Sequence, residues 1–372
     1  MLKLFNANKK NFSKKLELIL NSRRQKQRDQ SFAVKKILND VKNQGDKAVL
    51  KYERKFSNIK SKKTSIKFFK KKINEISKKI NKKLKKSIDI AFSRIKKFHK
   101  KQKFPSFKYK DQFNNELSYK YSPIDRVGVY VPGGTASYPS TVLMNCIPAL
   151  VAGVKNIYLT TPALGKTINP AIIYAAKKCG VREIYKTGGA HSIAAFTFGT
   201  KTFKKVNKIV GPGNAFVALA KKEVFGDVGI DMVAGPSEVS IIADKNSNPQ
   251  WIASDLIAQA EHDVFAQSIL ITNDMGLIKS VNSSLKSQLE ILPKKNIALK
   301  SIKNFGLSIY AKTQGKILEV VNEIAPEHLE INFENNANIL KKIKNAGSIF
   351  IGKFSPEAMG DYIAGPNNVL PT

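Results

Sequence analysis

The chain has 372 residues, 42% of them hydrophobic and 9% aromatic, which is enough for about two globular domains and excludes a disordered protein. Its formal net charge of +36 is carried mainly by Lys residues at helical spacing in the N-terminal third, a pattern typical of a solvated surface and not of nucleic-acid binding. No apolar run is long enough to cross a bilayer, and Met1–Asn6 lacks the apolar core of a signal peptide.

The N-terminal part, up to about residue 105, has the spacing of helices. Ile73, Ile76 and Ile80, for example, recur every three or four residues. Phe104-Pro105-Ser106 interrupts this pattern, and the polar stretch that continues to Tyr121 indicates a hairpin or a loop.

From Val127 onward, short β-branched runs alternate with helical patterns. The runs predict strands at 127–131, 156–160, 183–185, 239–243, 268–272 and 347–351, and the helical patterns lie at 142–151, 170–179 and 249–262. No internal repeat is visible. This alternation predicts parallel βαβ units with ligands at the carboxyl ends of the strands. We therefore predict an α/β protein of two doubly wound, Rossmann-like units that share a cleft, with a helical N-terminal region.

Cys146 and Cys179 both lie in apolar surroundings. Such positions are typical of buried, free thiols and not of a disulfide framework. We expect a reduced, cytoplasmic protein with neither nucleic acid nor a membrane as its partner.

Glycine-rich turns follow three of the predicted strands, at 132–134, 188–190 and 211–214. Glycine allows positive φ and a close approach of the backbone to a ligand. None of the turns has the spacing of the dinucleotide-binding fingerprint. An ordinary turn explains any one of them. Three such turns in one α/β unit support a nucleotide-binding cleft about as well as they support three ordinary turns.

The chain has only 4 histidines, and two of them, His262 and His328, directly follow a glutamate. A carboxylate next to an imidazole suits proton transfer or metal binding near neutral pH. A single histidine is more often a satisfied structural residue. Gln259 and His262 lie three apart on one helix face, and Asp361 is the candidate carboxylate that would complete a metal site with them, although spacing alone supports zinc only weakly.

Six segments of the chain resemble the histidinol dehydrogenase family, in the order in which that family has them. They are VGVYVPGGTASYPSTVLMN (127–145), KIVGPGNAFVALAKKEV (208–224), DMVAGPSEVSIIAD (231–244), SDLIAQAEHDVFAQS (254–268), APEHLEI (325–331) and SPEAMGDYIAGPNNVLPT (355–372). The resemblance implies two aldehyde-dehydrogenase-like units in a homodimer. It also implies oxidation of L-histidinol to L-histidine through L-histidinal, with zinc and two NAD⁺, as the last step of histidine biosynthesis.

The resemblance also implies roles for individual residues. The implied zinc ligands, which also contact the substrate, are Gln259, His262 and Asp361, and Ser237 also binds the substrate. The residues implied to hold NAD⁺ are Tyr130, His191 and Asn214. His328 is implied to be the general base and to contact the substrate, and Glu327 to activate water for the second oxidation. Removal of the hydroxyl proton helps hydride to leave carbon, and the aldehyde must be hydrated before a second hydride can leave.

The domains expected from the resemblance are an N-terminal segment (1–25), a first α/β domain (26–125 with 238–322) and a second (126–237 with 323–372). His191 replaces a glutamine of the family, so we expect weaker cofactor binding, and Asn368 replaces a histidine. The family continues past Thr372 into a segment that gives the neighbouring subunit a zinc ligand and a substrate-binding glutamate. We therefore expect this chain as given to bind zinc weakly and to turn over poorly, and a homologue that only binds ligands is the alternative.

Overall fold

The computed structural model describes residues 1–25, 30–57, 66–133, 138–163, 168–233, 235–333 and 337–366, and the side chains of 23–25 and 361 are not among the described groups. The chain divides into two compact units. Unit 1 comprises the described residues of Met1–Asp29 and Ala234–Gly360, and unit 2 comprises those of Gln30–Val233 and Asp361–Val369.

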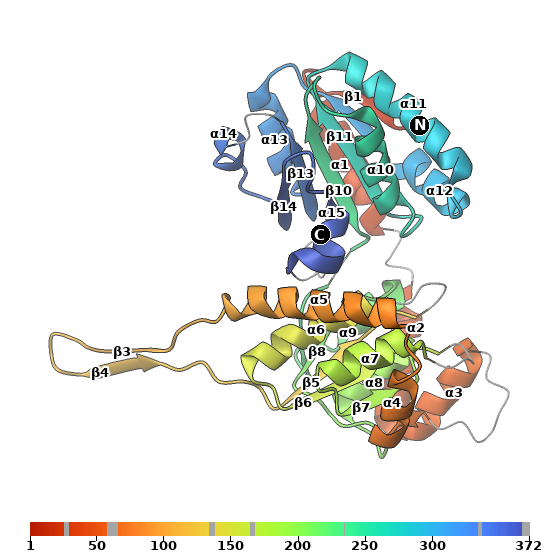
Figure 1. Ribbon diagram of the computed structural model, residues 1–372, viewed down its shortest axis with the longest axis vertical. Helices are drawn as coiled ribbons and strands as arrows, with labels where there is room; N and C mark the ends of the chain where they lie inside the picture. The colour runs from red at the N-terminus through yellow and green to blue at the C-terminus, as the bar shows by residue number, and fades with distance from the viewer. Residues whose placement is uncertain are drawn as a thin grey trace. The chain divides into compact units, whose positions relative to one another are not determined.

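Unit 1 is built on a six-stranded parallel sheet (Figure 1). The strands, in spatial order, are β1 (Lys3–Asn6), β12 (Leu307–Tyr310), β11 (Gln267–Thr272), β10 (Glu238–Ala243), β13 (His328–Asn332) and β14 (Ser348–Ile351). Its helices are α1 (Phe12–Gln25), α10 (Pro249–Ala260), α11 (Met275–Ile291), α12 (Lys295–Phe305), α13 (Gln314–Ile324), α14 (Ala337–Leu340) and α15 (Glu357–Met359).

Alternate side chains of these strands enter two separate cores. On one face Val239 and Ile241 pack with α10, α11 and α12. On the other face Leu329 and Ile331 pack with α1 and α13. Side chains alternate along a strand, so His328 and Glu330 share the face opposite Leu329, which is the face that α10 covers.

Unit 2 has a second six-stranded sheet. In spatial order its strands are β2 (Lys67–Phe68), β7 (Glu183–Tyr185), β6 (Asn156–Thr160), β5 (Arg126–Tyr130), β8 (Lys208–Val210) and β9 (Gly229–Ile230), all parallel except β2. Helices α4 (Lys70–Ser77), α5 (Lys82–Lys100), α6 (Pro139–Ala152) and α7 (Pro170–Lys178) share one core with it. Helices α2 (Ser31–Gln44), α3 (Asp46–Ser57), α8 (Gly189–Phe198) and α9 (Ala215–Glu223) share the other.

The two units have the same strand topology. In unit 2 the chain runs from the central strand β5 outward through β6 to β7, and then continues on the other side of β5 with β8 and β9. Unit 1 repeats this order, with β10 at the centre, β11 and β12 on one side, and β13 and β14 on the other. This is the doubly wound arrangement, in which ligands bind where the strand order reverses. The predicted α/β class is confirmed, whereas the cleft between the units stays a prediction.

Two further segments complete the described chain. Strands β3 (Phe107–Lys110) and β4 (Glu116–Tyr119) form an antiparallel hairpin, one of the two forms predicted for this stretch, which extends away from the rest of its unit (Figure 1). A short π-helix, η2 (Gly360–Ala364), follows α15. No helix among the described residues combines the length and the apolar character needed to cross a membrane.

The predicted domain boundaries are wrong. Strand β10 pairs with both β11 and β13, so residues 323–360 belong with 238–322 and not with 126–237. Residues 30–125 instead belong to unit 2, where α2 and α3 pack with α8, and α5 packs with α6. Hydrophobic periodicity identifies elements but does not reveal which distant strands will pair.

The N-terminal segment 1–25 is also not wholly helical. Strand β1 precedes α1 and pairs with β12 at the edge of the sheet of unit 1. The strand is only 4 residues long, and its burial pattern has exposed positions next to half-buried ones. An edge strand of this length gives too few alternating positions to distinguish it from a helix start.

Candidate functional site

The predicted catalytic pair lies at the amino edge of the sheet in unit 1. His328 is the first residue of β13 and pairs with Val239 near the start of β10. Ser237 directly precedes β10, and His262 lies in the turn between α10 and β11. These residues therefore lie at or before the amino ends of their strands, and not at the carboxyl ends, where a doubly wound sheet is expected to bind ligands.

The ring of His328 is held in one orientation by a backbone carbonyl. Its Nδ1 lies 3.0 Å from the carbonyl oxygen of Glu238. Since a carbonyl only accepts hydrogen bonds, Nδ1 is the protonated nitrogen and Nε2 keeps its lone pair in the neutral ring. Burial lowers the pKa of His328 to about 4, the hydrogen bond to Glu238 opposes this, and the charge that His262 carries when it is protonated lowers the pKa further. The ring is neutral near pH 7 and is a proton acceptor at Nε2.

The same backbone residue also holds Glu327. The Glu238 N–H donates to Oε2 of Glu327 at 3.0 Å, and this Oε2 lies 3.6 Å from Nδ1 of His328. The side chains of both Glu327 and His328 are buried. On the other side of the ring, Oε1 of Glu357 is 3.9 Å from Nε2 of His328. One imidazole therefore stands between two carboxylates.

Gln259 and His262 lie at the end of α10 as the sequence predicts. Gln259 is 1% exposed, and its Oε1 has no hydrogen-bond partner within the described part of the chain. His262 is exposed to solvent. The protein atoms around it nevertheless displace enough water to lower its pKa, and the charge of Glu261 opposes this change. The charge of His262 influences the pKa of His328, which indicates that the two imidazole rings lie near each other.

A neutral imidazole and a buried amide oxygen without a partner fit the donor chemistry of zinc. Among the described His, Cys, Asp and Glu side chains no group of three is placed to hold a metal ion. The third predicted ligand, Asp361, belongs to η2, and its side chain lies outside the described groups, as does all of Asn368.

In unit 2 the predicted cofactor residues gather at the carboxyl edge of the sheet. Tyr130 ends β5, His191 lies in the first turn of α8 after β7, and Asn214 follows β8. Asn214 is exposed and caps α9, since its Oδ1 accepts from the N–H of Val217 at 3.2 Å. Here the expectation for a doubly wound sheet is met, because β5 and β8 flank the reversal of strand order.

The side chains of Tyr130 and His191 are turned into the protein. The hydroxyl of Tyr130 accepts from the N–H of Gly189 at 3.2 Å, and burial raises the pKa of this tyrosine to about 12. His191 is 2% exposed, and its Nε2 lies 3.0 Å from Oε2 of Glu53. This geometry places His191 behind the glycine turn and does not favour the predicted direct contact with a cofactor.

Glu53 is a residue that the sequence did not single out. Besides His191, it accepts hydrogen bonds at 2.5 Å from the hydroxyls of Ser57 and Thr187. Burial alone raises the pKa of Glu53, but the hydrogen bonds outweigh it and lower the pKa. The carboxylate therefore stays ionised inside the core. Its position at the buried face of an amphipathic helix was the available signal.

Three more carboxyl groups in unit 1 were also missed. Glu330 lies two residues after His328 on the same strand face, and Asp255 lies four residues before Gln259 on the same helix face. Glu357, which borders the His328 ring, is the first residue of α15. For Glu330 and Asp255 the signal was the strand or helix period counted from a residue already selected.

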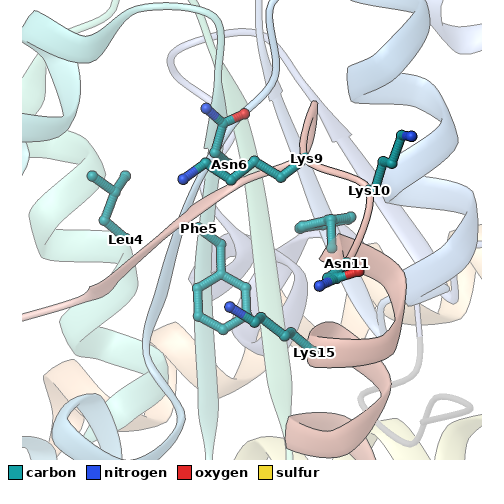
Figure 2. Close-up of a pocket in the computed structure, with 8 residues that line it drawn as sticks. Leu4, Phe5, Asn6, Lys9, Lys10, Asn11 and Lys15 are labelled. Carbon is teal, nitrogen blue, oxygen red and sulfur yellow. The ribbon is translucent and has the colours of Figure 1, made fainter.

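A cavity of about 440 Å³ lies elsewhere in unit 1, at the end of β1 and the start of α1 (Figure 2). Its described lining is Leu4, Phe5, Asn6, Lys9, Lys10, Asn11, Phe12 and Lys15. None of the predicted site residues lines it, so this cavity does not identify the site. Cys146 and Cys179 are both buried and free, as predicted.

Comparison with known proteins gives consistent matches over the whole chain. Residues 20–372 match the family model described as histidinol dehydrogenase. The histidinol dehydrogenase of Pelagibacter ubique is 53% identical over 373 residues, which cover 100% of this chain and 86% of that protein. The one from Mesorhizobium japonicum is 44% identical and is covered to 84%. The crystal structure of histidinol dehydrogenase from Elizabethkingia anophelis matches with a TM-score of 0.91 at 38% identity, covering 100% of this chain and 85% of that chain.

Proposed function

Since the chain belongs to the histidinol dehydrogenase family, we propose that it oxidises L-histidinol to L-histidine through L-histidinal, with two NAD⁺. The observation that carries this proposal is the contact between Nδ1 of His328 and the carbonyl of Glu238. It leaves Nε2 of a neutral, buried ring as the proton acceptor that alcohol oxidation needs.

In the first oxidation, Nε2 of His328 takes the hydroxyl proton while the carbon loses hydride. When bound, NAD⁺ would accept the hydride, and two NAD⁺ would be used, one in each oxidation. Glu357 stands 3.9 Å from Nε2, so its carboxylate stabilises the imidazolium that forms. In the second half, Glu327 takes a proton from the water that adds to the aldehyde carbon, and the His328 imidazolium returns its proton to the former carbonyl oxygen, which leaves the ring neutral again. His328 then accepts the hydroxyl proton of the hydrate as the second hydride leaves.

Gln259, His262 and Asp361 are the proposed zinc ligands and contact the substrate, and Ser237 completes the substrate site. When bound, zinc would hold the imidazole and amine of the substrate in place. The orphaned Oε1 of Gln259 and the lowered pKa of His262 support this assignment, because both groups are ready to bind a cation without losing a proton.

For the cofactor we propose the carboxyl edge of unit 2. Of the three predicted cofactor residues Asn214 is exposed, whereas Tyr130 and His191 lie buried beside the turn at Gly189. A glycine at 189 is required because its φ is +66°. We further propose a cytoplasmic homodimer, as the resemblance implies.

The test is a pair of rates, with L-histidinol and with L-histidinal as substrates. His328→Ala should slow both by a factor on the order of 10² or more, because both steps need the base. Glu327→Ala should slow mainly the aldehyde step, where water must be activated. His99→Gln, in unit 2, is the control and should leave both rates unchanged. Equal rates for wild type and His328→Ala would refute the base role. Ligand binding without any turnover would favour a homologue that only binds.

A further inference from the structure

A buried ion pair lies beside the glycine turn between β8 and α9 in unit 2. Lys221 of α9 is 2% exposed, although lysine is almost never fully buried unless it is paired. Its Nζ contacts Oδ1 of Asp231, which directly follows β9. A buried ion pair adds little stability over apolar side chains of similar size, so stability alone does not explain why these two charges lie inside the protein.

Both charged side chains also contact the backbone of Gly211, the first residue after β8. The N–H of Gly211 donates to Oδ2 of Asp231 at 2.7 Å, and the carbonyl oxygen of Gly211 accepts from Nζ of Lys221 at 3.0 Å. Asp231 is itself held in place, because its N–H donates to the carbonyl of Ile209 at 3.2 Å and its Oδ1 accepts from the N–H of Met232 at 2.7 Å. The ion pair therefore satisfies both backbone groups of a single glycine.

Gly211 needs these side chains because it lies outside the strand ladder. The pairing of β8 with β5 ends at Val210, and Gly211 has a φ of +115°, which turns its backbone away from the direction of the strand. A Cβ atom at position 211 would lie 2.1 Å from the carbonyl oxygen of Tyr130, so the glycine backbone packs directly against the end of β5. The start of the turn 211–214 is thus fixed both by this close packing and by the ion pair.

We propose that Lys221 and Asp231 are positioning residues for the cofactor, which keep the turn 211–214 in its binding shape before the cofactor arrives. The proposal rests on the proposed cofactor site at the carboxyl edge of unit 2. Both residues act through the backbone of Gly211, and Asn214, three residues further on, is the exposed side chain of the turn. A turn that is already ordered in the free protein loses less conformational entropy on binding, which raises the affinity without any new contact.

A purely structural role would have the ion pair only join α9 to the segment after β9. The double variant Lys221→Met/Asp231→Asn separates this role from positioning. It removes both charges with little change in side-chain size, and such a replacement of a buried ion pair costs little stability. The asparagine oxygen can still accept from the N–H of Gly211, but the carbonyl of Gly211 has lost its donor. A structural role therefore predicts normal cofactor binding in this variant, and a positioning role predicts weaker binding.

The experiment measures NAD⁺ binding by titration calorimetry, together with kcat, the two KM values and urea unfolding. We expect the double variant to unfold near the urea concentration at which the wild type unfolds and to bind NAD⁺ about tenfold more weakly, since about one backbone residue must now be ordered on binding. Its kcat and its KM for L-histidinol should stay within about twofold. Lys222→Met, at the neighbouring exposed position of α9, is the matched control. A stable double variant with the NAD⁺ affinity of the wild type would overturn the positioning role.

Hydrogen exchange of the wild type without NAD⁺ tests the same point without any variant. The amide proton of Gly211 should exchange slowly, because its hydrogen bond to Asp231 is present before binding. Rapid exchange that slows only when NAD⁺ is added would show that the cofactor orders the turn, which would overturn the proposal.

Failure of the proposed cofactor site is detected separately with Asn214→Ser. Serine can still cap α9, but the amide is removed. Weaker NAD⁺ binding is expected if the cofactor lies at this edge of unit 2. An affinity unchanged in Asn214→Ser would refute the cofactor site itself, whereas weaker binding in Asn214→Ser with unchanged binding in the double variant would refute only the role of Lys221 and Asp231.

Discussion

The carbonyl oxygen of Glu238 lies 3.0 Å from Nδ1 of His328, so strand β10 fixes the tautomer of a ring on strand β13. Val239 of β10 pairs with His328 of β13 in parallel register. Glu238, which precedes Val239, therefore lies beside the start of β13. The N–H of Glu238 holds Glu327 in the same way. Two adjacent side chains with different proposed roles therefore depend on the backbone groups of a single residue, Glu238, at the start of the neighbouring strand.

The tautomer of His328 can be observed directly. We expect its neutral ring to carry the proton on Nδ1, whereas free histidine favours Nε2. Because the chain has only 4 histidines, ¹⁵N-histidine labelling gives a spectrum that His328→Gln assigns by loss of one pair of signals. A protonated Nε2 in the neutral ring would contradict the geometry at Glu238 and, with it, the proposed proton acceptor.

His328 should also make the stability of the fold depend on pH. Its pKa is lowered from 6.5 to about 4, first by burial. The unfolded chain therefore takes up a proton at a higher pH than the folded chain does. The stabilisation is present above the unfolded pKa and is lost as the pH falls from about 6.5 towards about 4.

The measurement is urea unfolding at about pH 7.5 and about pH 5. The wild type should lose about 2 kcal/mol more than His328→Gln between these two values, since one pKa unit corresponds to about 1.4 kcal/mol. His99→Gln is a second test and not a neutral control, because burial also lowers the pKa of His99 and its loss should reduce the pH dependence in the same direction. An identical pH dependence of wild type and His328→Gln would show that the ring is protonated equally well in the folded state.

The fold class could be predicted because its signals are local. Strands 127–131, 156–160 and 239–243 are short β-branched runs, and the structure has β5, β6 and β10 at these positions. The division into units could not be predicted in the same way. Whether 328–332 pairs with 239–243 depends on contacts between segments about ninety residues apart, and neither segment has a pattern that names its partner.

The same difference between local signals and contacts of distant segments applies to the candidate site. Glu327, His328, Gln259 and His262 stand out from the sequence by residue type and spacing. The groups that orient them do not, because Glu238 acts through its backbone and Glu330 is one acidic residue among many. His191 shows the reverse case. Its position in a glycine turn indicated a ligand contact, but the ring points inward, to the buried Glu53 on α3.

Zinc binding gives a test of the residues on α10. Gln259→Ala and His262→Ala should each weaken zinc binding, with His262→Ala the stronger because imidazole is the better ligand. Zinc affinity is measured by competition with a chelator, and Gln288→Ala, a half-buried glutamine on α11, is the matched control. Unchanged affinity in both variants would place the metal elsewhere.

The buried pair of His191 and Glu53 should be a strong determinant of the stability of unit 2. Glu53→Ala removes the acceptor of three hydrogen bonds and leaves the His191 ring and the Thr187 hydroxyl without their partner. Each buried group left without its hydrogen bond costs about 1–3 kcal/mol, so the loss for the two groups together should be a few kcal/mol. This cost is measured by urea unfolding of Glu53→Ala, with Glu290→Ala, at an exposed position, as the control variant. We also expect Glu53→Ala to raise the KM for NAD⁺, because the turn at Gly189 loses its support. A stable variant with an unchanged KM would show that His191 holds its position without Glu53.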